Sequence, residues 1–173
     1  MKVWDITVTV RPGMPSYPGE PGPAIESIKS IDRGDAANVS LLSITTHTGT
    51  HMDAPCHFIP GGVSVDRIPP EALVGRAVVV EMAIEGHIGA RELEAASLPQ
   101  GVRRVLFKTH NSRFWEEPVF RKDFTAVGPD GALWLVQHGF TLVGIDYLSV
   151  EPFHSPAHET HRTLLGAGIV ILE

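Results

Sequence analysis

The sequence predicts one α/β domain that is rich in β structure. Its length of 173 residues suits a single compact domain with a sizeable core. Short apolar runs with β-branched residues recur along the chain, and two segments between them carry helix signals. Because no internal repeat, low-complexity tract or linker divides the chain, we expect residues 1–173 to form one domain.

The strands are expected where apolar residues alternate with polar ones or form short continuous runs. The first is 3–10, and eight of the 13 residues that follow, at 11–23, are Pro or Gly, which predicts a rigid irregular loop. Turns are expected at 34–38 and at 128–131. The further expected strands are 41–46, 77–82, 104–109, 133–136, 141–145 and 168–172.

Helices are expected at 90–97 and 155–165. In the second of these, Ser155 can cap the helix, Pro156 suits its first position and Gly166 can end it. His161 then shares a face with Leu164 and Leu165, so we expect its side chain to point inward.

The composition excludes several classes of protein. The 14 Lys and Arg against 20 Asp and Glu give a net charge of −6. The sequence also has no basic patch with interleaved aromatic residues, so we expect no nucleic acid partner. No apolar run approaches the length of a membrane span and no secretory leader is recognisable, so we expect a cytoplasmic protein without a membrane partner. The single cysteine, Cys56, excludes a disulfide framework and multi-cysteine metal sites. Any metal site must therefore use nitrogen and oxygen ligands.

The most informative segment carries three of the nine histidines and one aspartate within eleven residues. These are His47, His51, Asp53 and His57. A helix would spread them over two faces and is disfavoured by Gly49 and Pro55, while a fully extended backbone would separate His47 from Asp53 by about 20 Å. They can share a metal ion only if the segment bends near Gly49 into a compact loop. The alternative is that these four are ordinary polar loop residues. We expect Cys56 to be a buried small side chain.

Residues 47–58 read His-Thr-Gly-Thr-His-Met-Asp-Ala-Pro-Cys-His-Phe, which resembles the signature of the cyclase family, a group that includes bacterial kynurenine formamidase (arylformamidase) and isatin hydrolase. The similarity extends over most of the chain, through residues 17–20, 108–112 and 144–146. The resemblance implies a swivelling β/β/α fold and a homodimer or higher homo-oligomer. It also implies one or two divalent ions, Zn²⁺ or Mn²⁺, in each chain.

By the same resemblance, His47, His51 and Asp53 bind metal and His57 acts as acid or base. The family also has a His on a late helix and a Glu twelve positions downstream, which correspond to His161 and Glu173. Without the resemblance, we would interpret His161 as a core histidine and Glu173 as a solvated charge. We expect His158 to lie at the surface. The family chain continues beyond this Glu, so the resemblance implies that its C-terminal strands are truncated here.

The expected function is hydrolysis of an aryl formamide of the N-formylkynurenine type in tryptophan catabolism. A divalent ion makes hydroxide available at neutral pH and polarises a carbonyl, and an imidazole such as that of His57 suits proton transfer. Tyr17 and Phe58, with Trp115, are expected to enclose a flat aromatic substrate. Residues 147–152 depart from the kynurenine formamidase pattern, which weakens the case for that substrate but not for metal-dependent hydrolysis, and a hydrolase that opens a lactam such as isatin is one alternative. The other, which the expected C-terminal truncation supports, is a metal-binding protein without catalysis.

Overall fold

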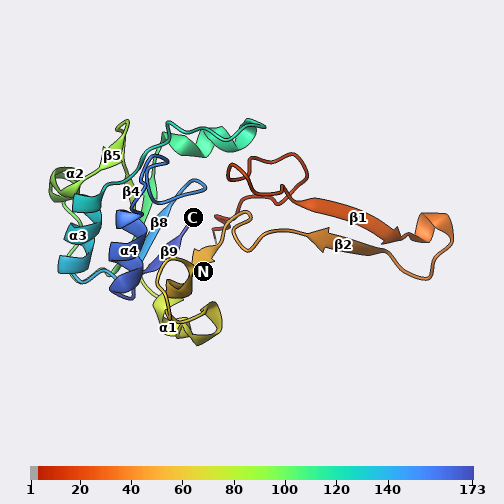
Figure 1. The fold of residues 1–173 in the computed structure, drawn as a ribbon, viewed down its shortest axis with the longest axis horizontal. Coiled ribbons are helices and arrows are strands. Elements are labelled where there is room, and N and C mark those ends of the chain that lie inside the picture. The colour runs from red at the N-terminus through yellow and green to blue at the C-terminus, as the bar shows by residue number, and fades with distance from the viewer. Residues whose placement is uncertain (1–3) are drawn as a thin grey trace.

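A computed structural model describes residues 4–173 and has a central sheet of five strands in the order β3-β9-β8-β6-β4 (Figure 1). The strands are β3 (Met52–Asp53), β4 (Val78–Glu81), β6 (Arg104–Lys108), β8 (Leu142–Ile145) and β9 (Val170–Leu172). Strands β4, β6, β8 and β9 are parallel, whereas β3 runs antiparallel to β9. The prediction of a mixed α/β domain is confirmed.

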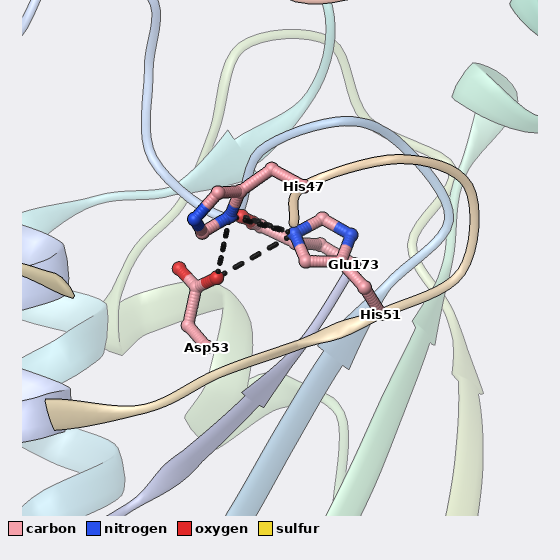
Figure 2. A group of neighbouring side chains, drawn as sticks. All are labelled: His47, His51, Asp53 and Glu173. Carbon is pink, nitrogen blue, oxygen red and sulfur yellow. Dashed lines mark hydrogen bonds and ion pairs between the residues drawn. The ribbon is translucent and has the colours of Figure 1, made fainter. Parts of the chain in front are cut away.

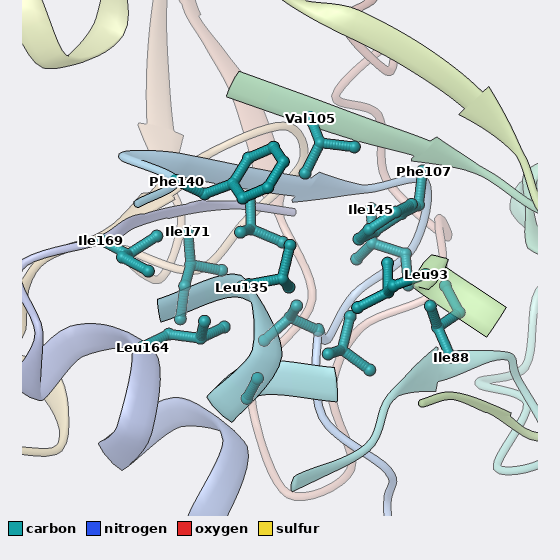
Figure 3. Close-up of a cluster of buried hydrophobic side chains, with 14 of the residues drawn as sticks. Ile88, Leu93, Val105, Phe107, Leu135, Phe140, Ile145, Leu164, Ile169 and Ile171 are labelled. Carbon is teal, nitrogen blue, oxygen red and sulfur yellow. The ribbon is translucent and has the colours of Figure 1, made fainter. Parts of the chain in front are cut away.

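Three helices cover one face of this sheet. They are α2 (Ala90–Ala95), α3 (Pro129–Gln137) and α4 (Glu159–Gly166). Figure 3 shows the core between the two layers, where Val105 and Phe107 of β6 meet Leu135 of α3. These two residues of β6 are buried because they lie on the same face of the strand, two positions apart. Among residues 4–173, no helix is long and apolar enough to cross a membrane.

Smaller elements lie around this body. A short helix, α1 (Pro70–Leu73), precedes β4, and β5 (His87–Ile88) pairs in parallel with β7 (Ala126–Val127). Single turns of 3-10 helix occupy Ile31–Arg33, Pro55–His57 and Val65–Arg67, and a longer one occupies His110–Glu116.

An antiparallel hairpin, which we call the arm, extends away from the body (Figure 1). It consists of β1 (Ala24–Lys29), β2 (Val39–Ser43) and the turn between them, and all residues of both strands are exposed. The predicted turn at 34–38 is confirmed, with Gly34 in a left-handed conformation. The predicted strand 41–46 is observed as β2, which begins two residues earlier and ends three residues earlier. Strand β1 was not predicted, because its mixture of charged and apolar residues follows no clean alternation.

Two predictions around α3 are wrong. The residues 133–136 form a helix, not a strand, and the expected turn at 128–131 contains the start of that helix. Pro129 occupies the first helical turn, where its missing N–H costs no hydrogen bond. Ala132 and Leu135 are buried while Leu133 is exposed, which is helical spacing, but a run of four apolar residues does not distinguish a helix from a strand.

Two further predictions need correction at their ends. Residues 4–10 are not part of any strand, because no neighbouring strand supplies the ladder that an extended segment needs; Val3 lies outside the described residues. The helix expected over 155–165 begins at Glu159, and Ser155 does not cap it: its hydroxyl donates to the Glu151 carboxylate instead. The remaining predicted elements, 77–82, 90–97, 104–109, 141–145 and 168–172, are confirmed within about three residues of their expected limits.

Candidate metal centre

The loop that carries the histidine cluster turns back sharply at Gly49. This residue has φ +67°, and a Cβ atom there would lie 2.9 Å from Cγ2 of Val10, so both the conformation and the space require glycine. The chain then enters β3, in which Asp53 is buried, and a 3-10 turn follows at Pro55–His57. The predicted compact loop that bends near Gly49 is confirmed.

Pairing of β3 with β9 brings the end of the chain to this loop. The backbone N–H of His51 donates to the carbonyl oxygen of Glu173 at 2.8 Å, and the N–H of Glu173 donates back to the His51 carbonyl at 3.0 Å. Two segments far apart in the sequence are thereby held side by side at one end of the sheet.

Four side chains meet there, with one potential ligand atom from each within 4.8 Å of all the others (Figure 2). They are His47, His51, Asp53 and Glu173. Asp53 Oδ1 lies 3.0 Å from His47 Nδ1 and 3.5 Å from His51 Nε2. Glu173 Oε1 completes the group at 3.9 Å from His51 Nε2.

His161 approaches the same group from α4. Its side chain is buried, as predicted, and Nε2 lies 3.7 Å from Asp53 Oδ2 and 3.9 Å from Glu173 Oε1. The structure therefore brings together all five residues that the sequence proposes as metal ligands.

The arrangement fits a divalent cation. Both carboxylate oxygens of Asp53 are fully buried, and neither has a hydrogen-bond partner among the described residues. An ionised carboxylate in that position is costly unless a positive charge compensates it. Nδ1 of His51 donates to the carbonyl oxygen of Gly49 at 2.9 Å, so the lone pair of a neutral imidazole is on Nε2, which faces Asp53. Imidazole nitrogens with carboxylate oxygens are ligands that suit Zn²⁺ or Mn²⁺.

The two carboxylates respond differently to burial. Burial alone would raise the pKa of Asp53, but the imidazoles of His47 and His51, with nitrogens 3.0 and 3.5 Å from Oδ1, outweigh it and hold this pKa well below its usual range. Complete burial raises the pKa of Glu173, in spite of the nearby imidazole of His161. Burial disfavours the charged form of His161 too, yet the hydrogen bond to Glu151 and the nearby carboxylate of Glu173 raise its pKa to about 9. Asp53 therefore stays ionised in a buried position, where a bound cation would compensate its charge.

His57 lies on the open side of this group. Its ring centroid is 4.0 Å from that of His47 and 4.2 Å from that of Phe58, and the residue is exposed. Burial of the inner part of the ring lowers the pKa of His57, and this lowering is reinforced by the neighbouring imidazoles. A neutral imidazole beside the candidate ligands is in a suitable state to accept a proton.

A cavity of about 160 Å³ opens beside His57. Both residues that the sequence proposes as substrate contacts, Tyr17 and Phe58, line it, together with His47 and His161. Trp115 does not: it lines a larger cavity of about 570 Å³, which is mainly apolar and has none of the histidines in its wall. The smaller cavity is therefore the one that the candidate ligands His47 and His161 share with His57.

One minor expectation is wrong, and one residue was missed. Cys56 is exposed because the 3-10 turn directs it outward. His158 lies at the surface as expected, with its side chain 45% exposed and its Nδ1 3.2 Å from Glu151 Oε2. Glu151 itself is buried beside His161. Its position after a strand and before Pro152 carries no periodic or motif signal that would have singled it out.

Comparison with known proteins identifies the family. The family model described as "Putative cyclase" matches residues 4–152, which include the whole histidine loop. The chain belongs to this cyclase family. A kynurenine formamidase from Erythrobacter litoralis is 33% identical over 99% of this chain and 78% of its own length.

Solved structures of cyclase-family type agree with the fold. One, titled as a potential metal-dependent hydrolase with cyclase activity, is 34% identical with a TM-score of 0.84, over 99% of this chain and 80% of its own. Isatin hydrolase A from Labrenzia aggregata, bound to benzyl benzoate, is 27% identical with a TM-score of 0.77, over 98% of this chain and 78% of its own.

Proposed function

We propose that this cyclase-family protein is a metal-dependent hydrolase of non-peptide C–N bonds, and specifically an arylformamidase that converts an N-formylkynurenine-type formamide to amine and formate. The convergence of His47, His51, Asp53 and Glu173 within 4.8 Å, beside a cavity with aromatic walls, is the observation that carries this proposal. The similarity to a kynurenine formamidase supports the substrate class and a place in tryptophan catabolism.

The protein's own side chains divide the work. The five candidate ligands would hold a divalent ion, which would supply acidification of water and polarisation of a carbonyl oxygen. His57 lies at the mouth of the cavity, where its imidazole takes the proton of the attacking water and returns it to the leaving nitrogen. Tyr17 and Phe58 contact the aromatic ring of the substrate and exclude water from one side of it.

A turnover assay tests the proposal and its alternatives. The 173-residue chain is loaded with Zn²⁺ or with Mn²⁺ and incubated with aryl formamides, isatin and an alkyl formamide as control. Release of formate from the aryl formamides alone supports the arylformamidase. Ring opening of isatin without formamide hydrolysis supports the lactam hydrolase, an alternative favoured by the similarity to isatin hydrolase A. A folded, metal-loaded chain without any turnover supports the metal-binding protein without catalysis.

We also propose that two copies of the chain associate through the arm. Aliphatic side chains on its strands are about half exposed: Ile25 (46%), Ile28 (52%), Leu41 (54%) and Leu42 (52%). A two-stranded hairpin is marginally stable alone, and exposed apolar patches mark association surfaces. A second copy brings an identical arm, which satisfies the self-complementarity of a two-fold interface.

Light scattering after gel filtration tests this association. Wild-type chain is expected at twice the monomer mass, and a Leu41→Ser, Leu42→Ser double variant at the monomer mass. Leu133→Ser is the matched control, since Leu133 is 50% exposed on α3, away from the arm. A monomeric wild type contradicts the proposal.

A further inference from the structure

Glu151 is a buried carboxylate next to the candidate metal centre that has no part in the proposed reaction. The residue is 3% exposed and lies in the loop between β8 and α4. Its Oε1 accepts hydrogen bonds from the Ser155 hydroxyl at 2.9 Å and from the backbone N–H of Thr160 at 2.8 Å. One carboxylate oxygen is therefore anchored to the first turn of α4, where a negative charge is also favoured by the helix dipole.

The other oxygen, Oε2, faces two imidazoles. It lies 2.7 Å from Nδ1 of His161 and 3.2 Å from Nδ1 of His158. An ionised carboxylate only accepts hydrogen bonds, so Nδ1 of His161 must carry a hydrogen. When His161 is neutral, its lone pair is then on Nε2, the nitrogen that faces Asp53 Oδ2 at 3.7 Å.

The same loop orients Glu173. The backbone N–H of Val150 donates to Glu173 Oε2, which leaves Oε1 directed toward Nε2 of both His51 and His161, at 3.9 Å from each. Val150 and Glu151 are neighbours in the chain, so one short segment orients two candidate ligands that come from different elements.

We propose that Glu151 is a positioning residue, which fixes the ring orientation and tautomer of His161 so that Nε2 is presented to a metal ion shared with Asp53. Carboxylates that accept a hydrogen bond from the second nitrogen of a ligand histidine are a common device in metal sites. The inference rests on the proposed function, because it requires that the centre binds metal.

A rival arrangement uses the same side chains as ligands. Glu151, His158 and His161 also lie close enough together to hold an ion of their own. The 2.7 Å between Glu151 Oε2 and His161 Nδ1 is typical of a charge-assisted hydrogen bond, and Glu151 Oε1 is already engaged by Ser155 and Thr160.

The variant Glu151→Gln tests the role in the full 173-residue chain. The amide oxygen replaces Oε1 as acceptor for Ser155 and Thr160, and the amide N–H₂ then faces His161 Nδ1. That nitrogen must become the acceptor, which moves the hydrogen to Nε2 and blocks it as a ligand. Zn²⁺ affinity, measured by competition with a chromophoric chelator, is expected to fall about 10–100-fold, with a circular dichroism spectrum like that of wild type.

Two variants separate the role from its rival. Ser155→Ala removes a hydrogen bond to Oε1 only, and His158→Asn removes the second imidazole from Oε2; both are expected to keep wild-type Zn²⁺ affinity. If His158→Asn lowers the affinity, or the number of ions bound, as much as Glu151→Gln does, the ion lies among Glu151, His158 and His161 and the proposal is overturned.

A measurement on wild-type protein does not depend on how the variants fold. ¹⁵N NMR of the Zn²⁺-loaded chain is expected to show His161 with a protonated Nδ1 and a metal-bound Nε2. Coordination through Nδ1 overturns this inference while leaving the proposed function in place. A wild-type chain that binds no Zn²⁺ overturns both.

Discussion

The candidate metal centre has two sides that the chain builds in different ways. The near side consists of His47, His51, Asp53 and His57, which all come from one loop of eleven residues. The far side consists of His161 in α4 and Glu173 after β9, which the loop at 150–151 orients. The near-side residues are close in the sequence, whereas Glu173 reaches them through the pairing of β9 with β3 and His161 through the packing of α4.

The two sides also differ in access to solvent. The side chain of His47 is 23% exposed and His57 lies at the cavity mouth, while the side chains of His161 and Glu173 are each 5% exposed. His47 and His57 are therefore open to substrate, whereas His51 and Asp53, with side chains 9% and 0% exposed, share the buried environment of the far side, where electrostatic interactions are strong. This difference predicts that changes on the two sides have separable effects.

The largest effect is expected from Asp53→Asn, because Asp53 contacts both sides. We expect this variant to lose its bound metal and its hydrolytic activity. The change is larger than the loss of roughly 100-fold in metal affinity expected when a residue that hydrogen-bonds to a ligand is altered. Metal content after gel filtration and formate release measure these. Asp32→Asn, at the tip of the arm, is the control and is expected to behave as wild type. Stoichiometric metal in Asp53→Asn would show that the two sides do not share an ion.

The next largest effect is expected on the rate of hydrolysis, without loss of metal. His57→Ala is expected to lower kcat by about 10²–10⁴-fold, the usual contribution of a general acid or base, with unchanged metal affinity. Steady-state kinetics with isothermal titration of Zn²⁺ separates the two quantities. His87→Ala changes an exposed histidine in β5 and serves as control. Full activity in His57→Ala would remove the assigned role of this residue.

A smaller effect is expected on the far side. His47, His51 and Asp53 alone supply three ligands, which is sufficient for an open metal site. We therefore expect Glu173→Gln to keep at least one ion, with an affinity lower by roughly 10–100-fold, measured by chelator competition. If Glu173→Gln loses all metal as Asp53→Asn does, the near side is not an independent site.

The smallest effect concerns the metal-free protein and pH. The pKa of His161 is raised to about 9 from an ordinary value of 6.5, so the folded state binds its proton more tightly than the unfolded chain. The resulting stabilisation is complete below pH 6.5 and is lost as pH rises through 9, on the order of 2–3 kcal/mol. The melting temperature should fall by roughly 5–10 °C between pH 6.5 and 9.5.

The same experiment compares the two sides. The pKa of His57 is lowered, so its contribution has the opposite sign and removes stability as pH falls below 6.5. His161→Asn is expected to flatten the alkaline loss and leave the acidic one. An unchanged alkaline loss in this variant would assign it to other groups.

Much of the near side could be predicted from the sequence. The spacing of His47, His51 and Asp53 around Gly49 predicted a compact loop that carries the ligands. The structure gives the reason, because Gly49 has a positive φ and a close contact that suit glycine. Alternating and continuous apolar runs also predicted the parallel strands of the body. The same reasoning failed at 133–136, where a short apolar run fits either period, and missed β1 of the arm, whose residues are all exposed.

The sequence by itself determined the ligand types, the loop that carries them and the α/β core, because these depend on local spacing and backbone preference. Only the tertiary structure decided that Glu173 lies beside His51 and that Glu151 lies behind His161, since these contacts depend on strand pairing and on where α4 begins. Contacts of this kind join residues that are distant in the chain, and no periodic pattern encodes them.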